Sequence, residues 1–124
     1  MTHPAAVCHG KISDDTDLRL VDEFKMVTML ADRNVKVTMT GPRMLAKVAW
    51  DEYYDGLPNM MQDLGKLMKR NFRKLKRASC KFVQIDEPLF IISDDNEVKA
   101  AVDAINIAIE GVNMAVMTHI CQGN

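Results

Sequence analysis

The chain alternates between short apolar segments and longer segments in which apolar residues recur every three or four positions. A short apolar run bounded by Gly, Pro or Asp is typical of a buried strand, and a spacing of three and four is typical of a helix that buries one face. The pattern predicts strands at residues 5–8, 35–39, 80–85 and 112–118. Because strands alternate with helices, we expect βα units and a parallel sheet.

Four amphipathic segments lie between these strands and predict four helices. The first helix is expected to begin within residues 13–17, which are acidic and rich in residues that cap helices. The last has Asp94 and Glu97 at the spacing of a capping box. The expected buried stripes are, in chain order, Leu20, Val21, Phe24, Val27 and Ala31; Met44, Leu45 and Val48; Met61, Leu64, Met68, Phe72 and Leu75; and Val98, Val102, Ile105 and Ile109.

Polar residues that suit ligand binding follow each predicted strand directly. They are His9, the Thr40-Gly41-Pro42 segment, Asp86 with Glu87, and His119 with Cys121. In parallel α/β folds, ligands bind at the carboxyl ends of the strands, so these four clusters are expected on one rim.

The His119 and Cys121 side chains form a candidate metal pair. Residues two apart on a strand share a face, so both are expected to point the same way. Imidazole and thiolate are ligands that zinc prefers. A structural zinc takes four protein ligands and a catalytic zinc takes three, so this pair is only part of a site.

Composition narrows the class of protein. With 124 residues, 48% apolar and 27% charged, the chain is expected to be a single soluble globular domain. The net charge of −1 gives no electrostatic reason to expect nucleic-acid binding. No apolar run is long enough to cross a membrane, and the N-terminus does not look like a signal peptide. Three cysteines do not form a secreted disulfide framework, so a reduced, cytoplasmic location is expected.

Seven basic residues crowd residues 66–77. They allow two interpretations, an anion-binding or nucleic-acid-binding patch and the solvated outer face of an amphipathic helix. We favour the second interpretation, because the opposite stripe is apolar and no aromatic residues interleave with the basic ones.

Three segments, in this order, resemble the cobalamin-independent methionine synthase superfamily. They are Thr38-Met39-Thr40-Gly41-Pro42, Gln84-Ile85-Asp86-Glu87-Pro88 and Thr118-His119-Ile120-Cys121, and Gly10-Lys11-Ile12 is similar to a strand end of shorter family members. The resemblance spans nearly the whole chain. It implies that residues 1–124 form the central portion of the family's catalytic barrel domain, a partial (β/α)₈ TIM-type barrel of about four parallel βα units.

The resemblance also implies an enzymatic role, the zinc-dependent transfer of a methyl or similar alkyl group to a thiol such as homocysteine. In the family, zinc is bound by the His and Cys of an H-x-C motif, which are His119 and Cys121 here. Asp86 would contact the homocysteine ammonium, and the Thr40-Gly41-Pro42 loop would shape the substrate pocket. The family's remaining ligands, a Glu and a Cys, would lie beyond Asn124.

Two departures from the family leave the alkyl donor open. The methionine synthases have a folate-contacting Glu soon after I-D-E-P, whereas residues 89–92 contain no carboxylate. They also have a Trp that packs on the pterin, and Val48 stands there in this chain, with Trp50 two residues later. Methylfolate and the donors of related enzymes, such as the epoxyalkane:coenzyme M transferases, therefore both remain candidates.

The same motifs also allow simpler interpretations. His119 and Cys121 could be a core histidine beside a buried thiol. Asp86-Glu87-Pro88 could be a polar turn, with Glu87 as a solvated charge or a partner for a Lys. The order of the motifs favours the zinc interpretation.

A rival hypothesis from another class is a non-catalytic remnant of the family that forms oligomers. Four strands cannot close a barrel, so both edges of the sheet would be open to pairing with another chain. Two copies could then bring two His119 and Cys121 pairs together.

Overall fold

The protein is seen in a computed structural model that describes residues 6–88, 90 and 93–121. Its described strands are β1 (Ala6–Cys8), β2 (Lys36–Thr40), β3 (Ala49–Asp51), β4 (Phe82–Asp86) and β5 (Ala115–His119). Its described helices are α1 (Leu20–Thr28), α2 (Pro42–Val48), α3 (Leu57–Arg77) and α4 (Asp95–Ile109). The order of elements confirms a chain built from βα units.

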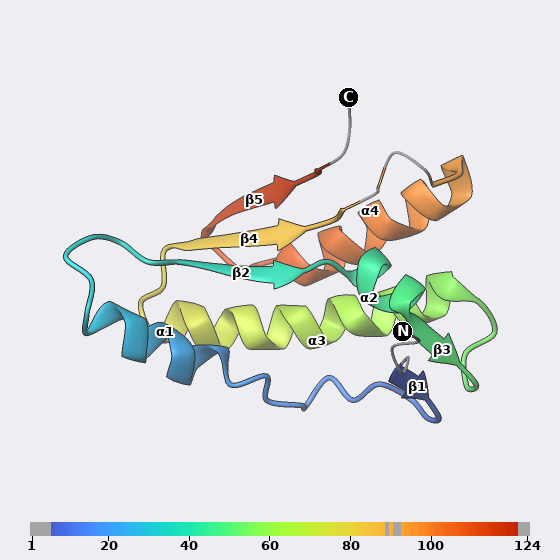
Figure 1. Ribbon diagram of the computed structural model, residues 1–124, viewed down its shortest axis with the longest axis horizontal. Helices are drawn as coiled ribbons and strands as arrows, with labels where there is room; N and C mark the ends of the chain where they lie inside the picture. Colours follow the sequence, from blue (N-terminus) through green and yellow to red (C-terminus); the bar gives the residue numbers. More distant parts are fainter. Residues whose placement is uncertain (1–5, 89, 91–92, 122–124) are drawn as a thin grey trace, which may run out of the picture.

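All strand pairs in the described residues are parallel, as predicted. One sheet has three strands in the order β2-β4-β5, and β1 pairs with β3 in a separate two-stranded sheet. Figure 1 shows α3 running alongside the three-stranded sheet. Helix α1 lies near one end of α3, and α4 lies beside α3. A parallel sheet with crossover helices is the unit from which (β/α)₈ barrels are built.

The two faces of the three-stranded sheet differ in burial. On β4, Val83 and Ile85 are fully buried, whereas Phe82, Gln84 and Asp86 alternate with them and are only partly buried. Successive side chains on a strand point to opposite faces, so one face packs on the helices and the other is free of helices in the described residues. We call the face that carries Phe82, Gln84 and Asp86 the helix-free face.

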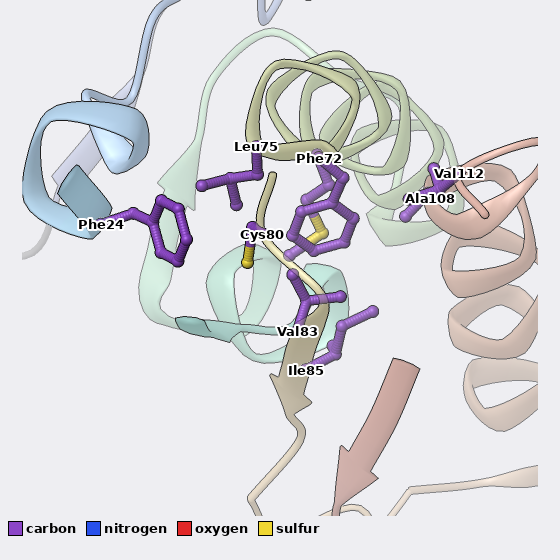
Figure 2. Close-up of a cluster of buried hydrophobic side chains, with 9 residues drawn as sticks. Phe24, Phe72, Leu75, Cys80, Val83, Ile85, Ala108 and Val112 are labelled. Carbon is purple, nitrogen blue, oxygen red and sulfur yellow. The ribbon is translucent and has the colours of Figure 1, made fainter. Parts of the chain in front are cut away.

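The main hydrophobic core lies between the sheet and α1, α3 and α4. Its buried members are Phe24, Met68, Phe72, Leu75, Cys80, Val83, Ile85, Ala108 and Val112. Figure 2 shows these side chains converging from α1, α3, β4 and the end of α4. A second cluster, which includes Met61, Ala101 and Ala104, fills the space between α2, α3 and α4.

The helix predicted to start within residues 13–17 begins instead at Leu20. The preceding segment is held along α3 by Asn71, whose side chain accepts a hydrogen bond from the Leu18 amide at 3.1 Å and donates one to the Thr16 carbonyl at 3.0 Å. These tertiary bonds satisfy the backbone outside a helix. The helix also ends at Thr28, so Val27 is exposed and Ala31 lies beyond it.

Strand β3 was not predicted. It has three residues and carries Trp50, which is 64% exposed. It pairs with β1 in the register Ala6↔Ala49. Three residues are too few to show a period of two, so only the pairing partner reveals the strand.

The N-cap predicted at the start of α4 is confirmed, because the Asp94 carboxylate accepts a hydrogen bond from the Glu97 amide at 2.8 Å. The Glu97 carboxylate, which would return the bond in a capping box, instead accepts from Arg43 and Lys47. The buried stripe of α4 differs from the predicted one. Its fully buried members are Ala101, Ala104 and Ala108, whereas Val102 is 44% exposed. The small side chains let α4 approach α3 closely.

Four of the seven basic residues of α3 are paired with nearby acids, which supports the solvated-face interpretation. The described ion pairs are Lys66–Asp63, Lys69–Glu110, Arg70–Asp15 and Lys74–Asp17. Two of the acids belong to the segment that runs along α3, so the pairs also help to place that segment. None of the described helices is both long and apolar enough to cross a membrane.

Substitution of Gly65 tests how closely α3 and α4 approach each other. Alanine is the better helix former by about 1 kcal/mol, so helix propensity alone would make Gly65→Ala stabilising. A Cβ at Gly65 would lie 2.5 Å from the Ala104 carbonyl oxygen, which belongs to the backbone and cannot move aside cheaply. We expect the substitution to lower the free energy of unfolding by about 1–3 kcal/mol, measured by urea denaturation.

Gly10→Ala is the matched control, since a Cβ there meets no atom within 4 Å. Its effect should stay within about 0.5 kcal/mol. A stabilising Gly65→Ala would show that the two helices are farther apart than described.

Candidate functional site

Three of the residues predicted for the site lie in one row across the three-stranded sheet. The strand register aligns Thr40 with Asp86 and Asp86 with His119. Aligned residues on neighbouring parallel strands point to the same face, and Asp86 lies on the helix-free face. The carboxyl ends of β2, β4 and β5 therefore present a hydroxyl, a carboxylate and an imidazole side by side on the helix-free face.

The other predicted residues lie close to this row but differ in exposure. Cys121 follows β5 and is partly buried. Gly41 and Pro42 are fully buried where α2 begins, and the Gly41 amide donates to the Asp86 carbonyl at 2.7 Å. This bond joins the end of β2 to the end of β4.

His9 does not join the row, contrary to the expectation of four clusters on one rim. It follows β1, which belongs to the two-stranded sheet, and its Nδ1 lies 2.8 Å from the Glu52 carboxylate at an exposed position. Residues 89–92 were expected to lack a folate-contacting carboxylate. Three of them, Leu89, Ile91 and Ile92, lie outside the described residues. Ala5, the first residue of the predicted first strand, and Asn124 also lie outside them.

Asp86 is held by a chain of polar side chains on the helix-free face. The Gln84 amide nitrogen donates to Asp86 Oδ1 at 2.7 Å, and Lys36 Nζ donates to Gln84 Oε1 at 2.5 Å. Neither Gln84 nor Lys36 was among the predicted site residues. The available signal was the spacing, since Gln84 precedes Asp86 by two positions and must share its face.

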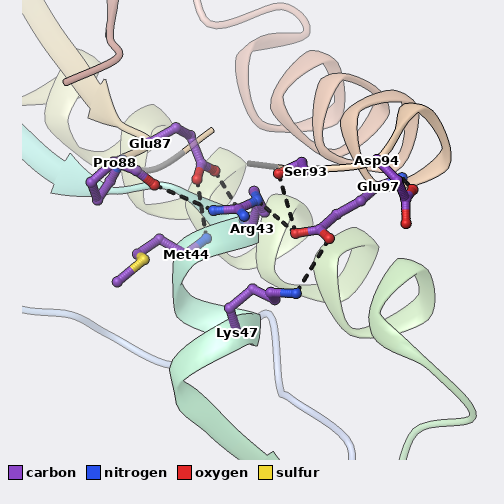
Figure 3. Close-up of polar contacts among 8 residues, drawn as sticks. All are labelled: Arg43, Met44, Lys47, Glu87, Pro88, Ser93, Asp94 and Glu97. Carbon is purple, nitrogen blue, oxygen red and sulfur yellow. Dashed lines mark hydrogen bonds and ion pairs between the residues drawn. The ribbon is translucent and has the colours of Figure 1, made fainter. Parts of the chain in front are cut away.

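Glu87 is neither a solvated charge nor a partner for a lysine, the two roles considered from the sequence. Its side chain is fully buried, and Figure 3 shows its carboxylate directed at the first turn of α2. The carboxylate oxygens accept hydrogen bonds from the Arg43 amide at 2.9 Å and the Met44 amide at 3.0 Å. These amides have no partner within the helix, so Glu87, which directly follows β4, serves as a cap for α2.

Burial raises the pKa of the Glu87 carboxyl above its ordinary value, because removal from water disfavours the charged form. The hydrogen bonds from the Arg43 and Met44 amides favour the ionised form and offset only part of this shift. The main chain of Glu87 also takes part, since its amide donates to the His119 carbonyl at 2.9 Å. Glu87 thus contacts both the start of α2 and the end of β5.

The space taken by Glu87 explains the glycine in the Thr40-Gly41-Pro42 segment. A Cβ at Gly41 would lie 2.2 Å from Glu87 Oε1. The residue is extended, with φ −73° and ψ 163°, so glycine is needed here for close approach and not for an unusual backbone angle.

A buried arginine continues this network toward α4. The Arg43 side chain is only 2% exposed, and its Nε donates to Glu97 at 2.7 Å while Nη1 donates to the Pro88 carbonyl at 3.3 Å. Lys47 donates to the other Glu97 oxygen at 3.3 Å (Figure 3). A buried guanidinium is tolerated only with such partners, and these tie the segment after β4 to α2 and α4.

The described residues match zinc in ligand type but not in number. His119 and Cys121 offer an imidazole and a thiol, which suit zinc. In residues 6–88, 90 and 93–121, however, no group of three or more His, Cys, Asp or Glu side chains is arranged to hold a metal ion. Any zinc bound through this pair would therefore need further ligands from outside these residues.

Comparison with known proteins identifies the family. A family model described as the catalytic domain of cobalamin-independent synthases matches residues 2–124. The chain belongs to this family. The resemblance seen in the strand-end motifs is therefore confirmed.

Similar proteins within the family are named methionine synthases. One from Sulfurisphaera tokodaii is 38% identical over 105 residues, which make up 84% of this chain and 31% of that protein. One from Pyrococcus furiosus is 37% identical over 106 residues, 85% of this chain and 31% of that protein. The chain thus spans about a third of the length of these relatives.

Solved structures confirm the fold class. A B12-independent methionine synthase from a Shewanella species, solved with selenomethionine, superposes with a TM-score of 0.77 and 23% identity over 84% of this chain and 30% of that one. A putative B12-independent methionine synthase from Listeria monocytogenes also gives 0.77 and 23%, over 94% of this chain and 41% of that one. The fold is consistent with part of a (β/α)₈ barrel.

Gly41→Ala tests the packing of Glu87. We expect it to lower the free energy of unfolding by about 1–3 kcal/mol, because the new methyl group overlaps the carboxylate. Glu87→Ala should also destabilise, since the Arg43 and Met44 amides lose their acceptor. Chemical denaturation of each single variant and of the double variant measures the coupling.

The double variant should be less destabilised than the sum of the single variants, by about 1 kcal/mol or more, because the methyl group then enters space that Glu87 has left. Additive effects would mean that Glu87 does not occupy the position described beside Gly41.

Proposed function

We propose that this chain provides part of the substrate site for a methionine-synthase-type reaction, the transfer of a methyl or similar alkyl group to a thiol such as homocysteine. Family membership supports the reaction class, and the names of the relatives support the thiol acceptor. The observation that carries the proposal is the strand register, which places Asp86 beside His119 at the carboxyl edge of the sheet. Ligands of parallel α/β folds bind at this edge.

Asp86 is the proposed acceptor for the ammonium group of an amino-acid thiol. Its carboxylate lies on the helix-free face and is partly buried, so an ammonium bound there would lose part of its hydration. A carboxylate partner compensates for that loss. The Thr40-Gly41-Pro42 segment forms the neighbouring edge of the pocket, and its position is fixed by the bond from Gly41 to the Asp86 main chain.

His119 and Cys121 are the proposed zinc ligands that this chain contributes. When bound, zinc lowers the pKa of a substrate thiol, so that a thiolate forms at neutral pH. The remaining ligands are proposed to come from groups outside the described residues. The alkyl donor stays open between methylfolate and other electrophiles. Trp50, which stands two residues after the position of the pterin-packing Trp, lies on β3 and is exposed.

A second candidate function is oligomerisation without catalysis. It is favoured by the two edges of the three-stranded sheet, β2 and β5, which have no further strand in the described residues. Such edges can pair with a second copy. This hypothesis predicts assembly that does not depend on Asp86.

Zinc binding tests the two proposed ligands. In the reconstituted protein, we expect zinc affinity, measured by chelator competition, to fall at least about tenfold in His119→Ala and in Cys121→Ser. Cys8→Ser is the matched control, since Cys8 lies on β1 in the other sheet. Equal zinc affinity in Cys121→Ser and in the unsubstituted protein would remove Cys121 from the ligand set.

Substrate binding tests Asp86 independently of zinc affinity. Asp86→Asn should weaken binding of L-homocysteine about tenfold or more in calorimetric titrations, because a charge-assisted hydrogen bond is lost. Binding of γ-mercaptobutyrate, which is homocysteine without its amino group, should change little. Asp103→Asn is the control, because Asp103 is an exposed carboxylate on α4 that pairs with Lys99. Unchanged homocysteine binding in Asp86→Asn would contradict the role given to this residue.

A further inference from the structure

We propose that Gln84 is a positioning residue for Asp86, which holds one carboxylate oxygen so that the other is presented to the ammonium group of an amino-acid thiol. The inference rests on the proposed function, because it takes Asp86 as the ammonium acceptor. It gives a role to a residue that had none in the sequence analysis, and it explains why an amide side chain stands at that position.

The geometry comes from the alternation of β4. Gln84 and Asp86 are two residues apart on the helix-free face, and Gln84 Nε2 lies 2.7 Å from Asp86 Oδ1. Lys36 reaches the same amide from β2, with Nζ 2.5 Å from Gln84 Oε1. Three side chains from two neighbouring strands thus form one continuous polar chain.

Lys36 and Asp86 lie at the two ends of this polar chain, and their chemistry fixes the orientation of the Gln84 amide. A lysine ammonium can only donate hydrogen bonds, and an ionised carboxylate can only accept them. The Gln84 oxygen must therefore face Lys36, and its NH₂ group must face Asp86. Rotating the amide by half a turn would set donor against donor and acceptor against acceptor, so one arrangement is strongly preferred.

A fixed Asp86 carboxylate is better prepared to bind an ammonium than a freely rotating one. Gln84 occupies Oδ1, and no described hydrogen bond or ion pair engages Oδ2. The ligand then meets an acceptor whose rotation is already restricted, which lowers the entropy lost on binding.

Packing is not what Gln84 contributes. The side chains that bury β4 against the helices are Val83 and Ile85, on the opposite face. Gln84 itself is only partly buried. A substitution that keeps its length and removes its amide should therefore change substrate binding without unfolding the protein.

The first experiment compares two ligands in Gln84→Met, which has a side chain of similar length and no amide. In calorimetric titrations of the full chain reconstituted with zinc, the Kd for L-homocysteine should rise about tenfold, and the Kd for γ-mercaptobutyrate should stay within about twofold. Thr38→Ser is the matched control, because Thr38 lies opposite Gln84 in the same cross-strand row. Unchanged homocysteine binding, or equal weakening for both ligands, would overturn the proposal.

A second measurement needs no ligand. The side-chain amide signals of Gln84 in ¹H–¹⁵N spectra should shift when Asp86 is replaced by Ala and should barely respond to Asp103→Asn. If Asp86→Ala leaves them in place, Gln84 does not hold Asp86 and the inference is wrong. If these signals shift as expected but the unsubstituted protein binds neither thiol, the proposed function fails while the link between Gln84 and Asp86 stands.

Discussion

The buried carboxylate of Glu87 is the constraint on which the arrangement of the strand ends depends. A carboxylate that water cannot reach must find hydrogen-bond donors in the protein, and here the donors are the Arg43 and Met44 amides of α2. The chain must therefore turn into a helix directly after β2, with Gly41 pressed against β4. The amide of Glu87 meanwhile bonds to the end of β5. One residue thus holds together the three strand ends that present the candidate site.

The residues that support the site from behind carry charges, and these charges are paired. Glu87 contacts the start of α2, the Arg43 side chain joins α2 to Glu97 on α4, and Lys47 completes the set. Acidic and basic groups alternate, so each buried charge has a partner of opposite sign or a backbone donor. The residues proposed to meet substrate lie on the helix-free face, while Glu87 and Arg43, which hold the strand ends in place, are buried. A site of this kind can be exposed to ligand and still be rigid.

Much of this arrangement could be predicted from local patterns. Periodicity located α3 and the parallel strands. Because parallel strands end at one rim, Asp86 and His119, which follow two of them, could be expected at the same edge. The Asp94 and Glu97 spacing identified the start of α4, because the N-cap bond between them is made within one turn of chain. These features depend on residues a few positions apart.

The features that were missed depend on contacts between distant segments. The start of α1 is displaced by hydrogen bonds to Asn71, more than fifty residues away. Strand β3 exists only because β1 lies beside it. Glu87 resembles a turn residue in the sequence, and its burial follows from the absence of a side chain at Gly41. No local period encodes such contacts.

The most direct test of this account is native-state hydrogen exchange at the amides of Gly41, Arg43, Met44 and Glu87, which join the three strand ends. The account predicts that they exchange as slowly as the amides of Val83 and Ile85 in β4, because they open only when the sheet itself opens. In Glu87→Ala, Arg43 and Met44 should lose this protection while Val83 and Ile85 keep it. Rapid, loop-like exchange of the Arg43 and Met44 amides in the unsubstituted protein would contradict the account.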